Sequence, residues 1–412
     1  MIDGHVRVAA LDMVHSHRRS AVVVGPLTLP SHDQLTTRLD AMTAAGPLAR
    51  LCLEPSAAGS RWRRVRESAE PRVYPIAAPK DSATLIDLLQ TVRGIDDRAV
   101  TLATAGDWLA IDFSHGLGEI PLIHTLLDVL FGITDARDTA TWRPYARTRS
   151  PLAAAAVATF GANPARLAKL LAAHRTRTAT APPGAETPGH GTAFTPTPAT
   201  RVIGLDAGQV AELRALRDRC LPGVSMVAVF TCALWSSFER AGIAVDDVVK
   251  IPFDVRRFLP GGRDTLASFS AGLDFVIDRA GGPARLHHEM TEAATTGRPV
   301  ANLLVGTAKA RSRSGRGPHA LPVPATPKLQ LLHSNLGSPQ WNGPWPFISA
   351  EQACMLVAND PATPTGVTVT SVTVAQNLWF TAEFHRSVFD PDAISTALGL
   401  LPQTVTDLLS SG

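Results

Sequence analysis

One histidine stands where the sequence changes from an apolar run to small residues. His115 follows the stretch 108–113, in which Asp112 is the only charged residue, and it precedes Gly116 and Gly118. The apolar run predicts a buried strand, and the glycines predict a turn. Histidine has an ordinary pKa near neutrality, so a neutral His115 could take a proton from an attacking hydroxyl or amine. The pattern therefore marks a candidate general base, although a core histidine bonded to a backbone carbonyl also fits it.

The predicted elements around His115 would hold it at a rigid junction. Pro121 and the apolar residues up to Leu130 predict a helix directly after the loop. Catalytic groups often lie on loops that are held between a strand and a helix. Glu119 lies four residues after His115, and by itself it fits a solvated acid that favours the helix dipole.

Composition and charge describe a globular protein. The chain has 412 residues, of which 45% are hydrophobic and 18% are charged, and its formal net charge is +3. This length predicts two or three domains, or two large lobes, and the small net charge gives no reason to expect nucleic acid as a partner. The four cysteines lack C-x-x-C spacing, so the sequence suggests neither a disulfide framework nor a zinc site.

No segment predicts a membrane span or a secretory signal. The N-terminal residues lack a basic flank and an apolar segment. The apolar stretch 151–174 contains Pro164, Arg166 and Lys169, which excludes it as a membrane span. We therefore expect a cytoplasmic protein, and we expect it to be a monomer.

The predicted elements fall into two halves. A segment rich in proline, threonine, glycine and alanine, 176–200, separates them. We expect a first lobe over residues 1–185, a linker over 186–200 and a second lobe over 201–412. Apolar runs predict strands over 21–24, 108–113, 201–205 and 248–253. Apolar periodicity and composition predict helices over 33–45, 81–92, 121–130, 151–174, 207–220 and 226–240, with a polar loop over 137–151.

Several motifs, in the same order along the chain, resemble those of one acyltransferase superfamily. The stretch Ser114-His115-Gly116-Leu117-Gly118-Glu119-Ile120 is similar to its His-His-x-x-x-Asp-Gly motif, with the catalytic second histidine at His115. The superfamily contains chloramphenicol acetyltransferase, nonribosomal peptide condensation domains, polyketide-associated acyltransferases and plant BAHD acyltransferases. Further similar segments are 46–51 (hP-x-L-R), 248–260 (V-P-V-D-L-R-x-x-L-P), 332–337 (S-N-L-G) and 384–390 (Y-D-x-x-x-F-D). The D-F-G-W-G motif of the BAHD branch is absent, so the condensation and polyketide-associated branches fit better.

The resemblance implies both a fold and a reaction. It implies an α/β protein with two chloramphenicol acetyltransferase-like lobes, mixed sheets flanked by helices, which form a V-shaped pseudo-dimer around a central tunnel. It also implies an acyl thioester donor, either acyl-CoA or a phosphopantetheinyl carrier protein, and a small hydroxyl or amine acceptor. His115 would deprotonate the acceptor, which then attacks the thioester directly, so no bound cofactor is expected. Bacterial specialised metabolism is the expected setting.

The motif departs from the family at three positions. Ser114 replaces the first histidine, Glu119 the aspartate and Ile120 the glycine. In the family the acid forms a salt bridge to the arginine of the D-L-R segment, which corresponds to Arg256. The resemblance thus implies a contact between Glu119 and Arg256 across the linker. The departures also leave open a degenerate member that only binds a carrier protein or ligand, and an amide-forming condensation enzyme would share the mechanism.

Other candidate site residues have two interpretations each. Ser334 and Asn335 could donate to a developing oxyanion, or they could form a strand-end turn with Gly337. Ser114 and Gly116 are further candidates for tunnel or oxyanion residues. Aromatic residues that could line an acceptor pocket, or simply belong to the core, are Trp341, Trp345 and Phe347. Arginines that could meet phosphates, or lie in a solvated loop, are Arg311, Arg313 and Arg316.

Metal, hydrolase and nucleotide chemistry are disfavoured. Histidines and acids lie near one another at His115, Glu119 and His124, and at His287, His288 and Glu292. Neither group reproduces H-E-x-x-H or another complete zinc ligand set, so no metal is expected. The sequence also lacks a G-x-S-x-G elbow and a G-x-x-x-x-G-K-[ST] loop.

Overall fold

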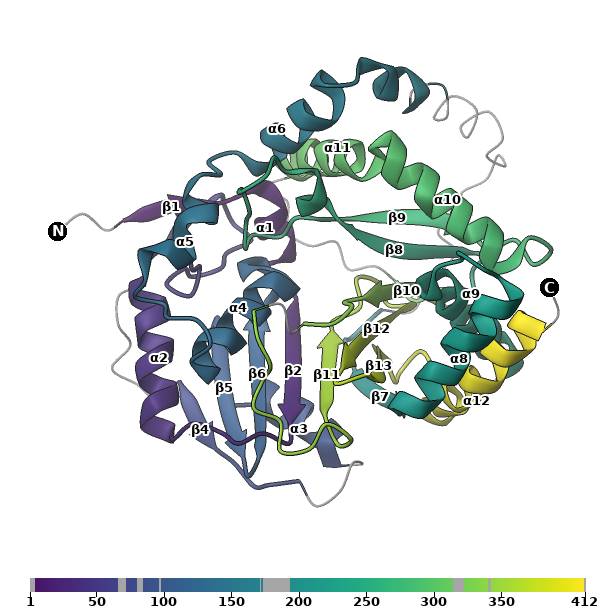
Figure 1. Ribbon diagram of the computed structural model, residues 1–412, viewed down its shortest axis with the longest axis horizontal. Coiled ribbons are helices and arrows are strands. Elements are labelled where there is room, and N and C mark those ends of the chain that lie inside the picture. Colours follow the sequence, from purple (N-terminus) through teal and green to yellow (C-terminus); the bar gives the residue numbers. More distant parts are fainter. Residues whose placement is uncertain are drawn as a thin grey trace.

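The computed structural model describes residues 4–65, 72–79, 84–95, 98–170, 172, 193–313, 322–339 and 342–410. Two large mixed sheets, one of five strands and one of six, form the framework, and helices flank them (Figure 1). A small two-stranded sheet pairs β1, His5–Arg7, with β3, Arg61–Arg63. The expected α/β class, with mixed sheets flanked by helices, is confirmed.

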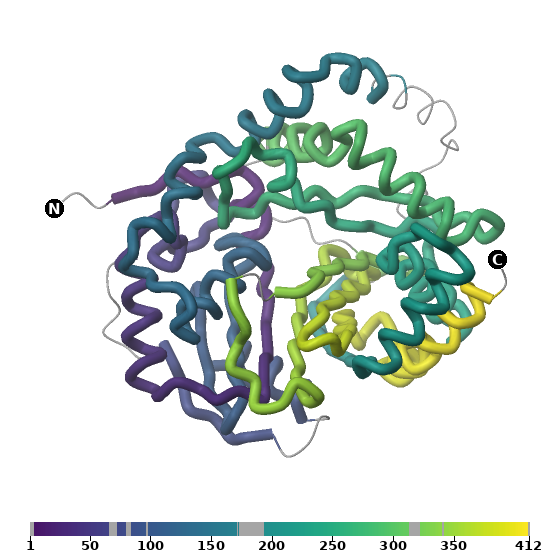
Figure 2. Tube along the Cα trace, in the orientation of Figure 1, coloured from purple at the N-terminus to yellow at the C-terminus, as the bar shows by residue number. Residues whose placement is uncertain are grey.

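The five-stranded sheet belongs mainly to the first half of the chain. Its order is β11-β2-β6-β5-β4, which are Cys354–Asn359, Arg19–Gly25, Trp108–Ser114, Val100–Ala105 and Val73–Pro75. The strands predicted over 21–24 and 108–113 are confirmed as β2 and β6, which pair antiparallel. β11 comes from the second half of the chain and pairs antiparallel with β2 (Figures 1 and 2). This sheet is therefore completed by a strand from the range expected to form the second lobe.

Both faces of this sheet are covered by helices. Side chains alternate between the faces of a strand, so Val22 and Val24 pack in one apolar cluster and Ala21 and Val23 in another. The first cluster contains apolar residues of α2, His32–Ala44, and α4, Ile120–Phe131, whereas the second contains those of α3, Thr84–Arg93. Burial on both faces explains why β2 is an uninterrupted apolar run.

The six-stranded sheet belongs to the second half of the chain. Its order is β7-β13-β12-β10-β8-β9, which are Pro198–Leu205, Asn377–His385, Gly366–Val374, Gln330–Asn335, Val248–Asp254 and Ser270–Val276. The accompanying helices are α8 (Ala207–Cys220), α9 (Met226–Arg240), α10 (Gly282–Thr296), α11 (Arg298–Arg313) and α12 (Pro391–Ser410). The predicted helices over 207–220 and 226–240 are confirmed as α8 and α9. A separate apolar core contains residues of this sheet and of α8, α9, α10 and α12.

Some local predictions need correction. The segment expected to be a polar loop contains α5, Thr139–Ala146, which Asp138 caps by accepting from the N–H of Ala140 at 2.8 Å. The long helix expected from Pro151 is divided, because α6, Pro151–Ala156, passes into a π-helical turn at Val157–Gly161 before the helical residues 164–170. Apolar and alanine-rich composition does not reveal such a change in helical hydrogen bonding.

Other expectations fall partly outside the described residues. Of the expected linker, residues 186–192 lie outside them, and β7 already begins at Pro198. Arg311 and Arg313 lie in the last turn of α11 rather than in a loop, whereas Arg316 is outside the described residues. The short helix α1, Ala10–His15, was not predicted.

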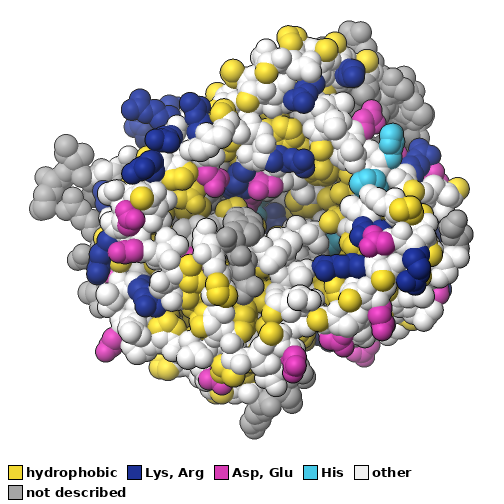
Figure 3. Space-filling view, in the orientation of Figure 1, with side chains coloured by type: hydrophobic (Ala, Val, Ile, Leu, Met, Phe, Trp, Pro, Cys, Tyr) yellow, Lys and Arg dark blue, Asp and Glu magenta, His cyan; other side chains and the backbone are white. Residues whose placement is uncertain are grey.

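The surface is mixed in charge. Acidic and basic side chains are interspersed over the face shown in Figure 3, in keeping with the net charge of +3. Within the described ranges, no helix combines the length and the apolar character that crossing a membrane requires.

Acid is expected to destabilise the fold through a buried histidine of the six-stranded sheet. His333 is fully buried, and its ring nitrogens lie 2.7 Å from Thr231 Oγ1 and 3.0 Å from Ser371 Oγ. Burial lowers the pKa of His333 from 6.5 to about 4. The unfolded chain therefore binds a proton near pH 6.5 that the folded chain takes up only near pH 4. The free energy of unfolding should fall across this window, by at most about 3 kcal/mol for this residue.

Urea unfolding at pH 7.5, 6.5 and 5.5 measures this effect. The variant His333→Gln should lose part of the pH dependence of the wild-type protein, whatever its stability at pH 7.5. His288 is exposed on α10, so His288→Gln should keep the wild-type dependence. Equal pH dependence in all three proteins would show that His333 does not contribute.

Candidate functional site

His115 lies at the predicted junction. β6 ends directly before it, a 3-10 turn covers His115–Leu117, and α4 follows. The backbone N–H of His115 donates to the carbonyl of Arg18 at 2.8 Å, and its carbonyl accepts from Ser268 Oγ at 3.3 Å. Both halves of the chain thus hold the backbone of this residue.

The two glycines of the motif allow other segments to approach closely. A Cβ on Gly116 would lie 2.6 Å from the carbonyl oxygen of Asp12 and 2.7 Å from Cα of Ser16. A Cβ on Gly118 would overlap the carbonyl oxygen of Leu266. These positions were predicted only as a turn, and close packing against α1 and against the second half of the chain is what requires glycine.

A buried arginine clamps the motif loop. Arg50 donates through Nε to the carbonyl of Leu117, and through Nη2 to the carbonyl of Gly116 at 3.1 Å. The same Nη2 lies 2.9 Å from Asp12 Oδ2, so the guanidinium charge is compensated. Asp12 Oδ1 also accepts from the backbone N–H of Ser268 at 3.1 Å. Arg50, from the segment that resembles hP-x-L-R, therefore joins the loop to α1 and to the second half.

The imidazole of His115 contacts the side chains of Ser20 and His15. Its Nδ1 lies 3.2 Å from Ser20 Oγ, and the ring of His15 packs edge-on against it with centroids 5.0 Å apart. Burial, with a further contribution from the charge of Arg18, lowers the pKa of His115 from 6.5 to about 3. His115 is therefore neutral at physiological pH, and among the described residues no group hydrogen-bonds to its Nε2.

Glu119 and Arg256 form the ion pair that the resemblance implies. Arg256 Nη1 lies 3.1 Å from Glu119 Oε2, and their side chains are only 9% and 13% exposed. Glu119 also accepts from the N–H and Oγ of Ser270 on β9, at 3.1 and 2.8 Å. Burial opposes the charge of Arg256, but the carboxylates of Glu119 and Asp254 outweigh it and raise its pKa. Glu119 is thus a partly buried partner of the second half and not a solvated acid.

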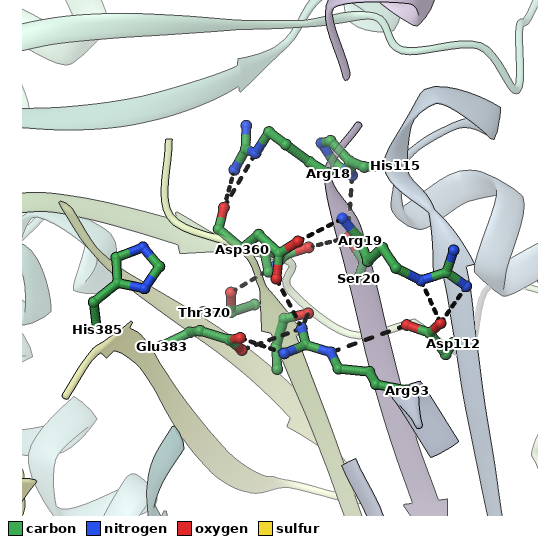
Figure 4. Close-up of polar contacts among 12 residues, drawn as sticks. Arg18, Arg19, Ser20, Arg93, Asp112, His115, Asp360, Thr370, Glu383 and His385 are labelled. Atoms are coloured by element: carbon green, nitrogen blue, oxygen red, sulfur yellow. Dashed lines mark hydrogen bonds and ion pairs between the residues drawn. The ribbon is translucent and has the colours of Figure 1, made fainter. Parts of the chain in front are cut away.

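A cluster of charged side chains lies close to His115 and Ser20 (Figure 4). It contains three arginines and three carboxylates: Arg18, Arg19, Arg93, Asp112, Asp360 and Glu383. Arg93 of α3 pairs with Glu383 of β13, and its Nη2 lies 3.5 Å from Asp360 Oδ1. The N–H of Arg19 donates to Asp360 Oδ2 at 2.7 Å. The opposite charges compensate one another, and the contacts hold the start of β2 beside the end of β11.

The other predicted site residues are placed differently. Asn335 uses its amide to donate to Ser371 Oγ at 2.9 Å and to accept from the N–H of Gly337 at 3.1 Å, which matches the strand-end turn. Ser334 is half-buried beside it on β10. Ser114 donates to the carbonyl of Ser16 at 3.1 Å, and it also lines a pocket of about 490 Å³. Within the described part of the chain, neither Ser334 nor Asn335 contacts His115. No contact therefore supports an oxyanion role for either residue.

Two of the three aromatic candidates, Trp345 and Phe347, belong to the core or pack against it. Trp345 is 3% exposed, donates to Asp128 Oδ1 at 2.8 Å and packs against Phe347 in the cluster that contains α2 and α4. Trp341 lies outside the described residues. His124 is buried on α4, where burial lowers its pKa to about 3. Within the described ranges, no three histidine, cysteine or acidic side chains are grouped to hold a metal ion.

Several residues near His115 were not singled out from the sequence. Ser20, Arg18, His15 and Asn359 carry no local pattern that separates them from ordinary strand or loop residues. Arg50, by contrast, could be predicted from the sequence, because its segment resembles a family motif. Ser114 occupies the position of the first histidine of the motif. A second histidine nevertheless lies beside His115, because His15 packs against its ring.

No family model and no curated protein matches the chain. Solved structures match over nearly its whole length. The trichothecene 15-O-acetyltransferase of Fusarium sporotrichioides has a TM-score of 0.60 and 9% identity, over 98% of this chain and 95% of that one. Polyketide synthase associated protein 5 of Mycobacterium tuberculosis has a TM-score of 0.57 and 17% identity, over 98% and 97%. The first condensation domain of the CDA synthetase has a TM-score of 0.54 and 16% identity, over 97% and 93%.

At these identities the likeness concerns the fold. The matching structures include an acetyltransferase and a condensation domain, and each is covered almost completely by this chain. The chain therefore has the same α/β fold as these acetyltransferase and condensation-domain structures, as the order of its motifs implied.

Proposed function

We propose that this protein is an acyltransferase that moves an acyl group from a CoA or carrier-protein thioester to a hydroxyl or amine, with His115 as the general base. The observation that carries the proposal is the neutral imidazole of His115, whose Nδ1 side meets Ser20 while Nε2 has no partner among the described residues. Fold likeness to an acetyltransferase and to condensation domains supports acyl transfer in general.

The proposed reaction needs no covalent enzyme intermediate. Nε2 of His115 takes the proton from the acceptor as its oxygen or nitrogen attacks the thioester carbonyl carbon. The tetrahedral intermediate then collapses, the carbon–sulfur bond breaks, and the imidazolium returns its proton to the leaving thiolate. The new bond is an ester or an amide, depending on the acceptor. Arg50 and the Glu119–Arg256 pair would keep the loop in position through these steps.

One observation favours a second candidate function. A pKa of about 3 makes His115 a weak base, because burial and the charge of Arg18 both disfavour the imidazolium form. A binding module for a carrier protein or an acyl ligand would need no base. This candidate differs from the first in a single measurable property, the release of thiol.

The test is a panel of thioesters and acceptors. Purified protein is incubated with short- and long-chain acyl-CoA, or with acylated carrier protein, together with alcohol and amine acceptors, while free thiol and product mass are measured. We expect acceptor-dependent thiol release that His115→Ala lacks. If thioesters bind but no donor releases thiol above the level of His115→Ala, the binding module is the correct function.

A further inference from the structure

We propose that Ser20 is a positioning residue which, with Asn359 and Thr370, holds His115 in the Nδ1–H tautomer, so that Nε2 is the atom that takes the proton. The inference rests on the proposed function for its catalytic consequence, although the tautomer itself can be measured without any activity. No motif of the chain points to these three residues.

Strand pairing places the side chains of Ser20, Asn359 and Thr370 next to one another. Ser20 and Asn359 are direct partners in the antiparallel pairing of β2 with β11. Ser20 Oγ lies 3.2 Å from His115 Nδ1 and 2.6 Å from Asn359 Oδ1. Asn359 Nδ2 in turn lies 3.0 Å from Thr370 Oγ1 on β12. The chain of hydrogen bonds runs from the motif loop through β2 and β11 to β12 of the six-stranded sheet.

The orientation of the Asn359 amide determines the tautomer. The amide of Asn359 donates through Nδ2 to Thr370, which leaves Oδ1 as the atom that faces Ser20. Ser20 has one hydroxyl hydrogen, and it donates this hydrogen to Oδ1. Its oxygen can therefore only accept from His115, so Nδ1 must carry the ring hydrogen and Nε2 the lone pair. The opposite amide orientation would reverse every bond and leave the hydrogen on Nε2.

Surrounding contacts keep this arrangement rigid. Ser20 is fully buried, so water does not compete for its hydroxyl. The N–H of His115 donates to the carbonyl of Arg18, two residues before Ser20, at 2.8 Å. Asp360, which follows Asn359, accepts from the N–H of Arg19 at 2.7 Å. The backbones that carry the ring, the hydroxyl and the amide are thus bonded to one another.

The tautomer determines what Nε2 can do in the reaction. With the lone pair on Nε2, the ring takes the proton of the acceptor there. The hydrogen bond from Nδ1–H to Ser20 Oγ then stabilises the imidazolium. After the carbon–sulfur bond breaks, Nε2–H returns that proton to the thiolate. In the other tautomer Nε2 already carries a hydrogen and cannot accept one. Restricting the ring to the competent form is the role assigned to Ser20.

The decisive measurement is a two-bond ¹H–¹⁵N correlation spectrum of protein labelled at histidine nitrogens, at pH 7. His115→Gln identifies the His115 signals. We expect the Nδ1–H pattern in the wild-type protein and a loss of that preference in Ser20→Ala, together with a fall in kcat of about ten- to a hundredfold at unchanged KM. Thr370→Val, which frees the amide, should show a smaller change in the same direction.

A control and the opposing results complete the test. Thr368 is a buried threonine on the same strand as Thr370, so Thr368→Val should leave the His115 signals unchanged. An Nε2–H pattern in the wild-type protein, or the same pattern in wild type, Ser20→Ala and Thr370→Val, would overturn the proposal. If the tautomer responds as expected but no thioester is cleaved, the proposed function fails while the hydrogen-bond assignment stands.

Discussion

The variant His115→Ala is expected to transfer acyl groups about 10² to 10⁴ times more slowly than the wild-type protein. The imidazole supplies the proposed base, and an alanine side chain has no group that can accept a proton. The loop itself should persist, because its contacts to Arg18 and Ser268 use the backbone of residue 115. Single-turnover thiol release under saturating donor measures the chemical step, and thermal unfolding measures the integrity of the fold.

The matched control is His288→Ala, which removes an exposed histidine from α10. It should retain full activity, whereas His115→Ala should lose activity and still unfold cooperatively near the wild-type temperature. A folded His115→Ala protein with wild-type turnover would remove His115 as the base. It would then leave the binding module as the better account of the His115 loop.

Breaking the ion pair between Glu119 and Arg256 is expected to destabilise the protein by about 3 to 5 kcal/mol, because the remaining charge is left in a poorly hydrated place. The two single variants should differ. Arg256 without Glu119 still has Asp254 Oδ1 3.0 Å from its Nη1, so Glu119→Ala should lie near the lower value. Among the described residues, Glu119 without Arg256 keeps only the neutral donors of Ser270, so Arg256→Ala should cost more.

A double-mutant cycle separates the pair from the other losses. Urea unfolding of both single variants and the double variant should give a coupling of about 1 to 3 kcal/mol. The exposed pair Lys250–Asp274 is the control, since surface pairs couple by only about 0.2 to 1 kcal/mol. Equal coupling in the two cycles would mean that the partly buried pair joins the two halves no more strongly than a surface ion pair would. Both Glu119 and Arg256 variants should also lose activity, because the pair holds the loop that carries His115.

Much of the local structure could be predicted from the sequence. The apolar run of β2 and that of β6 fill both faces of a covered sheet, so composition alone revealed them. α8 and α9 have clear N-caps at Asp206 and Ser225, and their bounds match the prediction. α5 was missed because a short, polar surface helix has little apolar periodicity. The π-helical turn after α6 was missed because its composition is that of an ordinary helix.

The candidate site divides in the same way. His115, Glu119 and Arg256 could be predicted from the sequence because their order resembles a family pattern, and the ion pair expected between the last two is present. Arg18, Ser20 and Asn359 could not be predicted, because no pattern in the sequence indicates which strand lies beside which. Asn335 shows the opposite case, where a motif residue has its amide engaged in a turn.

The resemblance of its motifs to a known family implied the class of fold. The sequence by itself determined the strand and helix that flank the motif, and the chemical type of its central residue. These depend on local periodicity, on capping and on the ordinary pKa of a side chain, all of which act over short stretches. The tertiary structure alone decided the protonation and orientation of that residue. Burial lowers the pKa of His115, and the crossover of β11 brings Asn359 to Ser20 from 339 positions away. Desolvation and hydrogen-bond direction depend on which distant segments meet, and only the packed chain specifies that.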